Sequence, residues 1–295
     1  MSIVEINKLI KSFGKQTVLN ELDLIVKEGE IYGFIGPNGA GKTTTIRILL
    51  GMLKKDSGSV KLLGGDPWKD SVKLHKRIAY VSGDVSLWPN LSGGEVIDFL
   101  GNLQGGFNPD KRKELVNAFQ LDTGKKCRTY SKGNRQKVAL VAALASDAEF
   151  LILDEPTSGL DPLMERIFQE YIIKAKKEGR TVLLSSHILA EVEAVCDVVG
   201  IIRQGKIVES GSLKELRHLT RTSITVELEN REFNFDNIAG IHNISKKGEK
   251  IIFSAADEYM DDVMKVLATV GIKSIVAEPP TLEELFLRHY GEELK

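Results

Sequence analysis

The sequence lacks any long hydrophobic run. Its longest unbroken apolar segment, Val138 to Ala145, has eight residues and is ended by Lys137 and Ser146. A membrane-spanning helix needs about 20 such residues, so we expect no spanning helix. The first residues, Met1 to Lys8, also lack the basic and then apolar order of a signal peptide. These absences argue against the integral-membrane and secreted classes.

Cysteine, aromatic residues and net charge are scarce as well. The two cysteines, Cys127 and Cys196, cannot form a disulfide framework or a four-ligand metal site alone, so we interpret them as packing thiols of a reducing cytosol. Forty basic residues nearly balance 41 acidic ones, and the net charge of −1 gives no reason to expect nucleic acid as the main partner. At roughly 100–200 residues per domain, 295 residues predict about two domains.

What the sequence does contain is a set of apolar segments separated by helical patterns. Ile31–Ile35, Phe150–Leu153 and Thr181–Leu184 are almost wholly apolar, which is typical of strands buried on both faces. Helical spacing begins at Thr43 and returns from Pro162 to Lys177. Buried strands that alternate with helices predict an α/β fold with a parallel sheet.

The other segments complete a plan of two domains. Residues 1–35 and 54–82 predict short strands with tight turns, and residues 92–148 predict helices. A boundary falls near residue 220, which gives a first domain of residues 1–219 and a second of residues 220–295. The second domain is predicted as a small α+β domain, with strands at 223–228, 250–253 and 272–276 and helices at 259–270 and from 282 to about 289.

The segment Gly36-Pro37-Asn38-Gly39-Ala40-Gly41-Lys42-Thr43 fits the phosphate-loop pattern G-x-x-x-x-G-K-[ST]. It follows a predicted buried strand and opens a predicted helix, as this motif requires. The glycines let successive backbone N–H groups turn inward, and the helix N-terminus adds positive potential. We predict that Lys42 contacts the β- and γ-phosphates of a nucleoside triphosphate and that the Thr43 hydroxyl ligates Mg²⁺. The predicted nucleotide-binding residues here are Gly36, Pro37, Asn38, Gly39, Ala40, Gly41, Lys42, Thr43 and Thr44.

An acidic pair, Asp154 and Glu155, directly follows the predicted strand Phe150–Leu153. Ligands of open α/β sheets bind at the carboxyl ends of strands. We expect Asp154 to hold Mg²⁺ through water and Glu155 to accept a proton from an attacking water. The alternative is an ordinary solvated strand end. The phosphate loop in the same chain argues against it, because triphosphate hydrolysis needs a metal ligand and a group that orients water.

The longer segment Asp154-Glu155-Pro156-Thr157-Ser158-Gly159-Leu160-Asp161 resembles the Walker B strand and D-loop of ATP-binding cassette (ABC) ATPases. That family carries a Leu-Ser-Gly-Gly-Gln signature upstream. Leu91–Glu95 is closer in composition but begins 63 residues before Asp154. Tyr130–Asn134 begins 24 residues before Asp154 and leads into a predicted helix from Lys137 to Leu144. We take Tyr130–Asn134 as the signature segment, and interpret Ser92 and Glu95 as a capping box that starts a helix.

The resemblance covers residues 1 to about 218 and implies a P-loop NTPase fold of the ABC type. Such a fold has an antiparallel β subdomain and a helical subdomain, here at about residues 85–147, followed by the small C-terminal α+β domain. It also implies a head-to-tail dimer in which the signature segment of one chain closes the ATP on the phosphate loop of the other.

The resemblance assigns roles to residues on both sides of that dimer. Ser131 and the Gly133 backbone are expected to contact the γ-phosphate. Lys132 stands where the family has glycine, and it either adds positive charge near the phosphates or faces solvent. Ser158 and Asp161 are expected at the dimer seam.

Two further residues match family positions. His187 follows the strand Thr181–Leu184, as the family's switch histidine does, and is expected to contact the γ-phosphate and orient the base Glu155. Phe13 matches the aromatic A-loop residue that stacks on adenine. The alternative for Phe13 is a hydrophobic turn residue.

One position departs from the family pattern. The segment Arg77 to Asp84 places Gly83 where the family has its Q-loop glutamine, which helps to ligate Mg²⁺ and senses the membrane partner. Asp84 is a substitute oxygen donor for the metal, or the metal contact runs through water. The departure affects the Q-loop contact and leaves the prediction of ATP binding unchanged.

The tail Pro279–Leu287 resembles the carboxyl-terminal element of ATPase subunits of bacterial drug and antibiotic exporters; an amphipathic helix that packs its own domain is the alternative. The resemblance therefore implies an ATP-hydrolysing subunit of a membrane exporter, with ATP and Mg²⁺ as cofactors. Its expected partners are a second copy of the chain and separate transmembrane permease subunits, with no nucleic acid. Its expected location is the cytoplasmic face of the cell membrane.

Two other functions compete with this one. A cassette ATPase that acts on ribosomes or DNA is disfavoured because the chain holds a single cassette, no long coiled coil and no excess of positive charge. A P-loop kinase or GTPase does not account for Ser131, Gly133 and His187 at the family spacing.

Overall fold

The computed structural model describes residues 1–218, 222–229, 235 and 238–278. The chain divides into two compact units, Met1–Ser210 and Gly211–Lys295. The boundary that the sequence predicts between residues 219 and 220 lies shortly after this division. The division of the chain into an ATPase domain and an accessory domain at that boundary stays a prediction. No helix within the described residues is long and apolar enough to cross a membrane.

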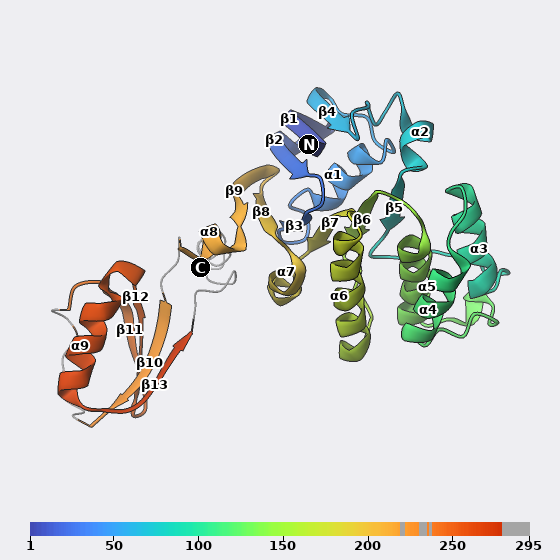
Figure 1. Ribbon diagram of the computed structural model, residues 1–295. Helices are drawn as coiled ribbons and strands as arrows, with labels where there is room; N and C mark the ends of the chain where they lie inside the picture. Colours follow the sequence, from blue (N-terminus) through green and yellow to red (C-terminus); the bar gives the residue numbers. More distant parts are fainter. Residues whose placement is uncertain (219–221, 230–234, 236–237, 279–295) are drawn as a thin grey trace. The chain divides into compact units, whose positions relative to one another are not determined.

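A six-stranded sheet forms the centre of the first unit (Figure 1). Its order is β5-β6-β7-β3-β8-β9, and β5, β6, β7, β3 and β8 pair in parallel. The bounds are β3 Ile31–Ile35, β5 Ile78–Val81, β6 Phe150–Asp154, β7 Thr181–Ser186, β8 Val198–Arg203 and β9 Lys206–Ser212. Every residue of β3, β6 and β7 is buried, as their apolar sequences predict. Because these three strands are parallel neighbours, the loops that follow them meet at one edge.

A three-stranded antiparallel sheet of order β2-β1-β4 lies beside α1 (Figure 1). The bounds are β1 Ser2–Phe13, β2 Gln16–Lys27, β4 Ser57–Leu62 and α1 Lys42–Leu49. Alternate apolar residues of the strands, such as Leu9 and Leu22, join Ile46 and Leu49 of α1 in one core. The prediction of strands alone over residues 54–82 was incomplete, because the structure adds the helix α2, Ser71–His75. A helix of five residues is too short to show a helical period.

Three helices gather at the β5 edge of the large sheet (Figure 1). They are α3 Gly93–Leu103, α4 Pro109–Ala118 and α5 Lys132–Ala145. The sequence predicted residues 92–148 as helical, but positive φ angles at Gly105 and Gly106 end α3. The predicted capping box is confirmed: Ser92 Oγ accepts from the Glu95 N–H at 3.2 Å, and the Ser92 N–H donates to the Glu95 carboxylate at 2.6 Å.

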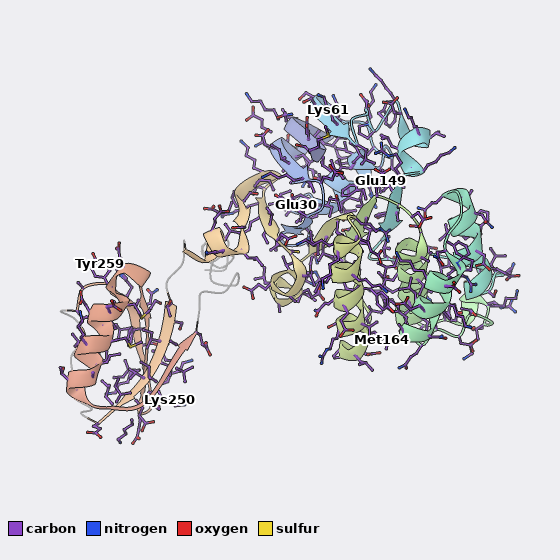
Figure 2. All side chains as sticks on the ribbon, in the orientation of Figure 1. Glu30, Lys61, Glu149, Met164, Lys250 and Tyr259 are labelled. Carbon is purple, nitrogen blue, oxygen red and sulfur yellow. The ribbon has the colours of Figure 1, made fainter. Side chains whose placement is uncertain are left out.

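Two more helices, α6 Pro162–Lys177 and α7 Leu189–Val195, complete the first unit. An ion pair ties the starts of two strands together: Arg77, before β5, donates from two guanidinium nitrogens to Glu149, before β6, at 2.6 Å each (Figure 2 labels Glu149). Such bidentate pairs fix geometry as well as charge. Both cysteines are buried free thiols, as the sequence predicts.

A buried arginine, Arg180, caps the carboxyl end of α5. Its guanidinium donates to the carbonyl oxygens of Ala148 at 2.7 Å and of Leu144 and Ala143 at 3.1 Å each. The carbonyls of Leu144 and Ala143 belong to the last turn of the helix, where no backbone N–H is available as a partner, and that of Ala148 lies just beyond it. Burial lowers the pKa of Arg180 to about 10, so the side chain is still charged at neutral pH.

We expect Arg180→Met to lower the free energy of unfolding by about 3 kcal/mol, because each buried carbonyl left without a donor costs about 1–3 kcal/mol. Urea denaturation followed by circular dichroism measures the change. The control is Arg166→Met, since Arg166 is exposed and pairs only within its own helix with Glu170. Equal stabilities of the two variants would contradict the capping role.

The second unit contains a four-stranded antiparallel sheet of order β11-β12-β10-β13. The bounds are β10 Thr222–Leu228, β11 Ile241–Lys247, β12 Lys250–Ala255 and β13 Ile272–Glu278, with the helix α8 Leu213–His218 before them and α9 Met260–Val270 between β12 and β13. Ile224 and Phe253 of the sheet pack with Val263 and Leu267 of α9. The predicted strands and the helix at 259–270 are confirmed, whereas β11 was not predicted. The predicted last helix and the segment Pro279–Leu287 lie outside the described residues.

Candidate functional site

The phosphate loop joins β3 to α1. Gly41, the last residue before α1, has φ +115°, which only glycine adopts at low cost. Lys42 is buried, and its ammonium donates to the carbonyl oxygens of Gly36 at 2.6 Å and Pro37 at 3.2 Å. Burial lowers the pKa of Lys42, and the negative charges of Glu155 and Asp154 oppose that shift. The loop therefore curls around a desolvated positive charge.

The carboxylate of Asp154 lies at the end of β6 and contacts two hydroxyl groups. Thr43 Oγ1 donates to Asp154 Oδ2 at 3.0 Å, and Ser185 Oγ donates to Asp154 Oδ1. The contact between Thr43 and Asp154 joins two of the predicted metal ligands, which come from segments far apart in the sequence. A hydroxyl and a carboxylate at this spacing are hard oxygen donors of the kind that Mg²⁺ prefers, so the residues fit the predicted metal.

Glu155 is the meeting point of the predicted catalytic residues. Its Oε1 lies 3.1 Å from Nδ1 of His187 and 3.8 Å from Nζ of Lys42. Glu155 has φ +48° and precedes Pro156. A non-glycine residue in this region carries about 1 kcal/mol of strain, and such residues cluster at functional sites. Three residues from three separate loops therefore converge, as the sequence predicts.

The signature segment packs against the D-loop of the same chain. Ser131 is the N-cap of α5 and accepts from the Asn134 N–H at 3.3 Å. A side chain at Gly133 would collide with the Gly159 carbonyl, which explains the glycine. The Lys132 ammonium donates to Ser158 Oγ at 2.7 Å, a partner that neither sequence alternative named.

Asp161 is the N-cap of α6 and accepts from the Met164 N–H at 3.0 Å. The contacts of Asp161 and of the signature segment lie within one chain. The γ-phosphate and dimer-seam roles of Ser131, Lys132, Gly133, Ser158 and Asp161 stay predictions.

Gly83, at the place of the family's Q-loop glutamine, lies directly against the acidic pair. A Cβ atom at Gly83 would stand 3.0 Å from the Asp154 carbonyl oxygen and 3.1 Å from Glu155 Cβ. A side chain at this position would require Asp154 and Glu155 to shift by a few tenths of an ångström, so glycine fits this packing. Asp84 is exposed, and its N–H donates to Ser82 Oγ at 3.4 Å. Its metal role stays a prediction.

Phe13 ends β1 at the hairpin with β2, and the side chain is 51% exposed. The Lys11 ammonium lies 5.4 Å from the ring centroid. The ring is half exposed at the hairpin, a position that suits both the predicted stacking role and the alternative of a hydrophobic turn residue, so the stacking role stays a prediction.

Three residues that hydrogen-bond to the segment Asp154–Thr157 were not predicted from the sequence. They are Ser185, Gln136 and Glu191. Buried Glu191 accepts from Thr157 Oγ1 at 2.6 Å and from Ser186 Oγ at 2.9 Å, which fixes the D-loop to the end of β7. The signal for Gln136 was its helical spacing with buried apolar residues of the same helix, which marks an inward-facing position.

The comparisons with known proteins now decide the family. The sequence profile of the ABC transporter family matches residues 19–158. The bacitracin transport ATP-binding protein BcrA of Enterococcus faecalis is 34% identical over 74% of this chain and 72% of its own length. The chain belongs to the family of ABC transporter ATP-binding proteins. Its fold class is therefore the predicted one, and its activity is ATP hydrolysis coupled to transport.

Other comparisons extend the match of this ABC transporter ATPase to both units. The linearmycin resistance ATP-binding protein LnrL of Bacillus subtilis is 29% identical over 99% of this chain and 100% of its own length. The profile of the DrrA1-3-like C-terminal domain matches residues 211–290. A solved ATP-binding cassette, a dimer with ADP and phosphate after hydrolysis, superposes with a TM-score of 0.65 at 24% identity and covers 71% of this chain and 98% of that one.

Proposed function

We propose that this ABC ATPase powers the export of antibiotics or other small molecules through separate transmembrane permease subunits. The observation that carries the proposal is the convergence of Lys42, Glu155 and His187 beside the Thr43–Asp154 oxygen pair. The names of BcrA, a bacitracin transport protein, and LnrL, a linearmycin resistance protein, support antibiotics as the cargo class and export as the direction. The relatives offer no support for a role on ribosomes or DNA.

The chemical roles follow from the geometry. Lys42 binds the β- and γ-phosphates once its ammonium leaves the loop carbonyls, and the helix α1 adds its N-terminal potential. Thr43 and, through water, Asp154 would hold Mg²⁺, which when bound would neutralise phosphate charge. Glu155 accepts a proton from the attacking water, and His187 holds the Glu155 carboxylate through Nδ1.

The working unit is a homodimer. Ser131 and Gly133 lie at the N-terminus of α5, where N–H groups bind anions, and they close the ATP that the phosphate loop of the second chain holds. Ser158 and Asp161 lie at the seam. The contact between Lys132 and Ser158 brings the signature segment and the D-loop to one surface of the chain.

A groove of about 470 Å³ beside β5 is the proposed permease site. It is lined by residues of α2, β5, α3 and α5 and by Leu50 and Met52 after α1. Exposed apolar side chains surround it, among them Met52, Val72 and Leu103. An apolar helix of the membrane subunit fits such a groove, and binding there holds the ATPase at the cytoplasmic face of the membrane.

We expect Leu103→Glu to abolish coupling, because it places a charge among the apolar contacts of the groove. Leu103 is 62% exposed, so the substitution leaves folding intact. The control is Ile25→Glu on β2, since Ile25 is 56% exposed and lies outside the groove. The measurement is the susceptibility to bacitracin and linearmycin of cells in which each variant replaces the chain, together with co-purification of the integral membrane subunit.

Cells with the Leu103→Glu variant should be as susceptible as cells that lack the chain, and this variant should no longer co-purify with the membrane subunit. Cells with the Ile25→Glu control should match wild-type cells in both measurements. Unchanged susceptibility after deletion of the chain would contradict antibiotic export. Equal behaviour of the two variants would contradict the groove as the docking site.

A further inference from the structure

The amide side chain of Gln136, on α5, is completely buried (0% exposed). Its Nε2 donates to the carbonyl oxygens of Pro156 at 2.9 Å and Ser82 at 3.3 Å. Both partners are acceptors, so the nitrogen end of the amide must face them. The Oε1 atom accepts no hydrogen bond from the part of the chain that the structure describes. A buried unpaired acceptor is destabilising, so folding stability alone does not explain a glutamine here.

The first partner of Gln136 belongs to the catalytic loop. Pro156 directly follows Glu155, whose positive φ requires neighbouring contacts to hold it. The Glu155 N–H donates to the Ser185 carbonyl at 3.0 Å, which fixes one side of the residue. On the other side, Gln136 binds the carbonyl of Pro156, the residue after Glu155. Loss of the Gln136 amide therefore removes a hydrogen bond that holds the loop on which the Glu155 carboxylate is positioned.

The second partner of Gln136 lies at the end of a groove-lining strand. Ser82 follows β5, whose residues Ile78 to Tyr80 line the groove, and Gly83 beyond it packs against Glu155. The helix α5 also lines the groove, through Ala139, one turn beyond Gln136. Gln136 thus lies on one groove-lining element, α5, and is hydrogen-bonded to the residue that follows another, β5. A shift of α5 relative to β5 changes at least one of its two hydrogen bonds.

The same helix begins at the signature segment. Ser131 is the N-cap of α5, and Gln136 lies between Ser131 and the groove-lining Ala139. A rigid helix moves as one body, so a displacement at either end reaches Gln136. Gly83 has no side chain to make an equivalent link. Gln136 is the point at which the groove, the signature helix and the catalytic loop meet.

We propose that Gln136 is a positioning residue that couples the permease groove and the signature helix to the Glu155 carboxylate. The proposal rests on the proposed function, because it assigns the base to Glu155 and the permease to the groove. Gln136 contacts no reacting atom. It acts by holding the Pro156 carbonyl, and with it Glu155, in the hydrolytic position.

The test is steady-state ATP hydrolysis by the purified full-length chain with MgATP as substrate. Gln136→Met keeps the length of the side chain and removes the amide. We expect kcat to fall about 10- to 100-fold, the effect of a small misplacement of a catalytic group, while KM and the binding of a fluorescent ATP analogue stay within twofold of wild type. The control is Ser146→Ala, which removes a buried hydrogen bond at the other end of α5; its kcat should stay within twofold of wild type.

A kcat for folded Gln136→Met within twofold of wild type would overturn the proposal. A parallel fall of kcat and ATP binding would also overturn it, because that is the signature of a structural role. If Gln136→Met does not fold, Gln136→Asn, which shortens the amide out of reach of Pro156, should give the same selective loss of kcat; failure of both to fold makes the role structural.

Glu155→Gln, measured in parallel, separates this proposal from the proposed function. Normal turnover of Glu155→Gln means that the catalytic assignment fails, whatever Gln136 does. If Glu155→Gln is inactive and Gln136→Met has the kcat of the wild type, only the coupling role of Gln136 fails.

Discussion

Glu155→Gln should lower kcat for ATP by about 10³-fold, within the range of about 10²–10⁴-fold for general acid–base catalysis. The amide keeps the shape of the carboxylate but cannot accept a proton from water. Its oxygen still lies within reach of Lys42 and His187, which contact Oε1 in the wild type. ATP binding should therefore stay within a few-fold of the wild-type value. Phosphate release from saturating MgATP measures kcat, and a fluorescent ATP analogue measures binding.

The matched control is Glu149→Gln. Glu149 and Glu155 flank the same strand, β6, at opposite ends, and Glu149 pairs with Arg77 at the end opposite Glu155. This control should cost some stability and leave kcat within twofold of wild type. If Glu155→Gln turned over ATP as fast as Glu149→Gln, the base would have to be another group.

Lys42→Ala should raise the dissociation constant for ATP by about 30- to 140-fold. A charge-assisted contact to a phosphate in a desolvated site contributes about 2–3 kcal/mol, and each 1.4 kcal/mol is tenfold. The ammonium is already buried before nucleotide binds, and its lowered pKa reflects that burial. The ammonium is therefore desolvated in advance, which reduces the cost of its contact with the phosphates.

The control for this variant is Lys61→Ala, an exposed lysine on β4 that pairs with Glu5 at 3.9 Å (Figure 2). Calorimetric titration with ATP measures both variants, and thermal unfolding shows that the phosphate loop has kept its fold. Wild-type affinity of folded Lys42→Ala would rule out Lys42 as the phosphate ligand.

The sequence predicted the phosphate loop from its motif, the acidic pair from its place after an apolar strand, and His187 from its resemblance to the family's switch histidine, and all three follow buried strands. Apolar runs of this kind mark strands buried on both faces, and the carboxyl ends of parallel strands share an edge. The convergence of Lys42, Glu155 and His187 is therefore a consequence of strand order. The structure adds the distances between them.

The contacts that the sequence could not predict depend on packing between distant segments. Ser185 meets Asp154 only because β7 pairs with β6, and Gln136 meets Pro156 only through the packing of α5. Lys132 illustrates a second limit. Its position at the start of a helix is clear from the sequence, but the direction of a long flexible side chain is not. Secondary structure was missed where elements are short, as with α2, or polar and exposed, as with β11.

The central claim is that one chain holds only half of each ATP site and that a second copy completes it. Light scattering of purified Glu155→Gln, with and without MgATP, tests this claim most directly, because the variant should bind ATP without hydrolysing it. We predict a mass of one chain, 32.6 kDa, without nucleotide. With MgATP we predict twice that mass, with one ATP bound per chain. An ATP-loaded variant that stays at the mass of a single chain would contradict the account.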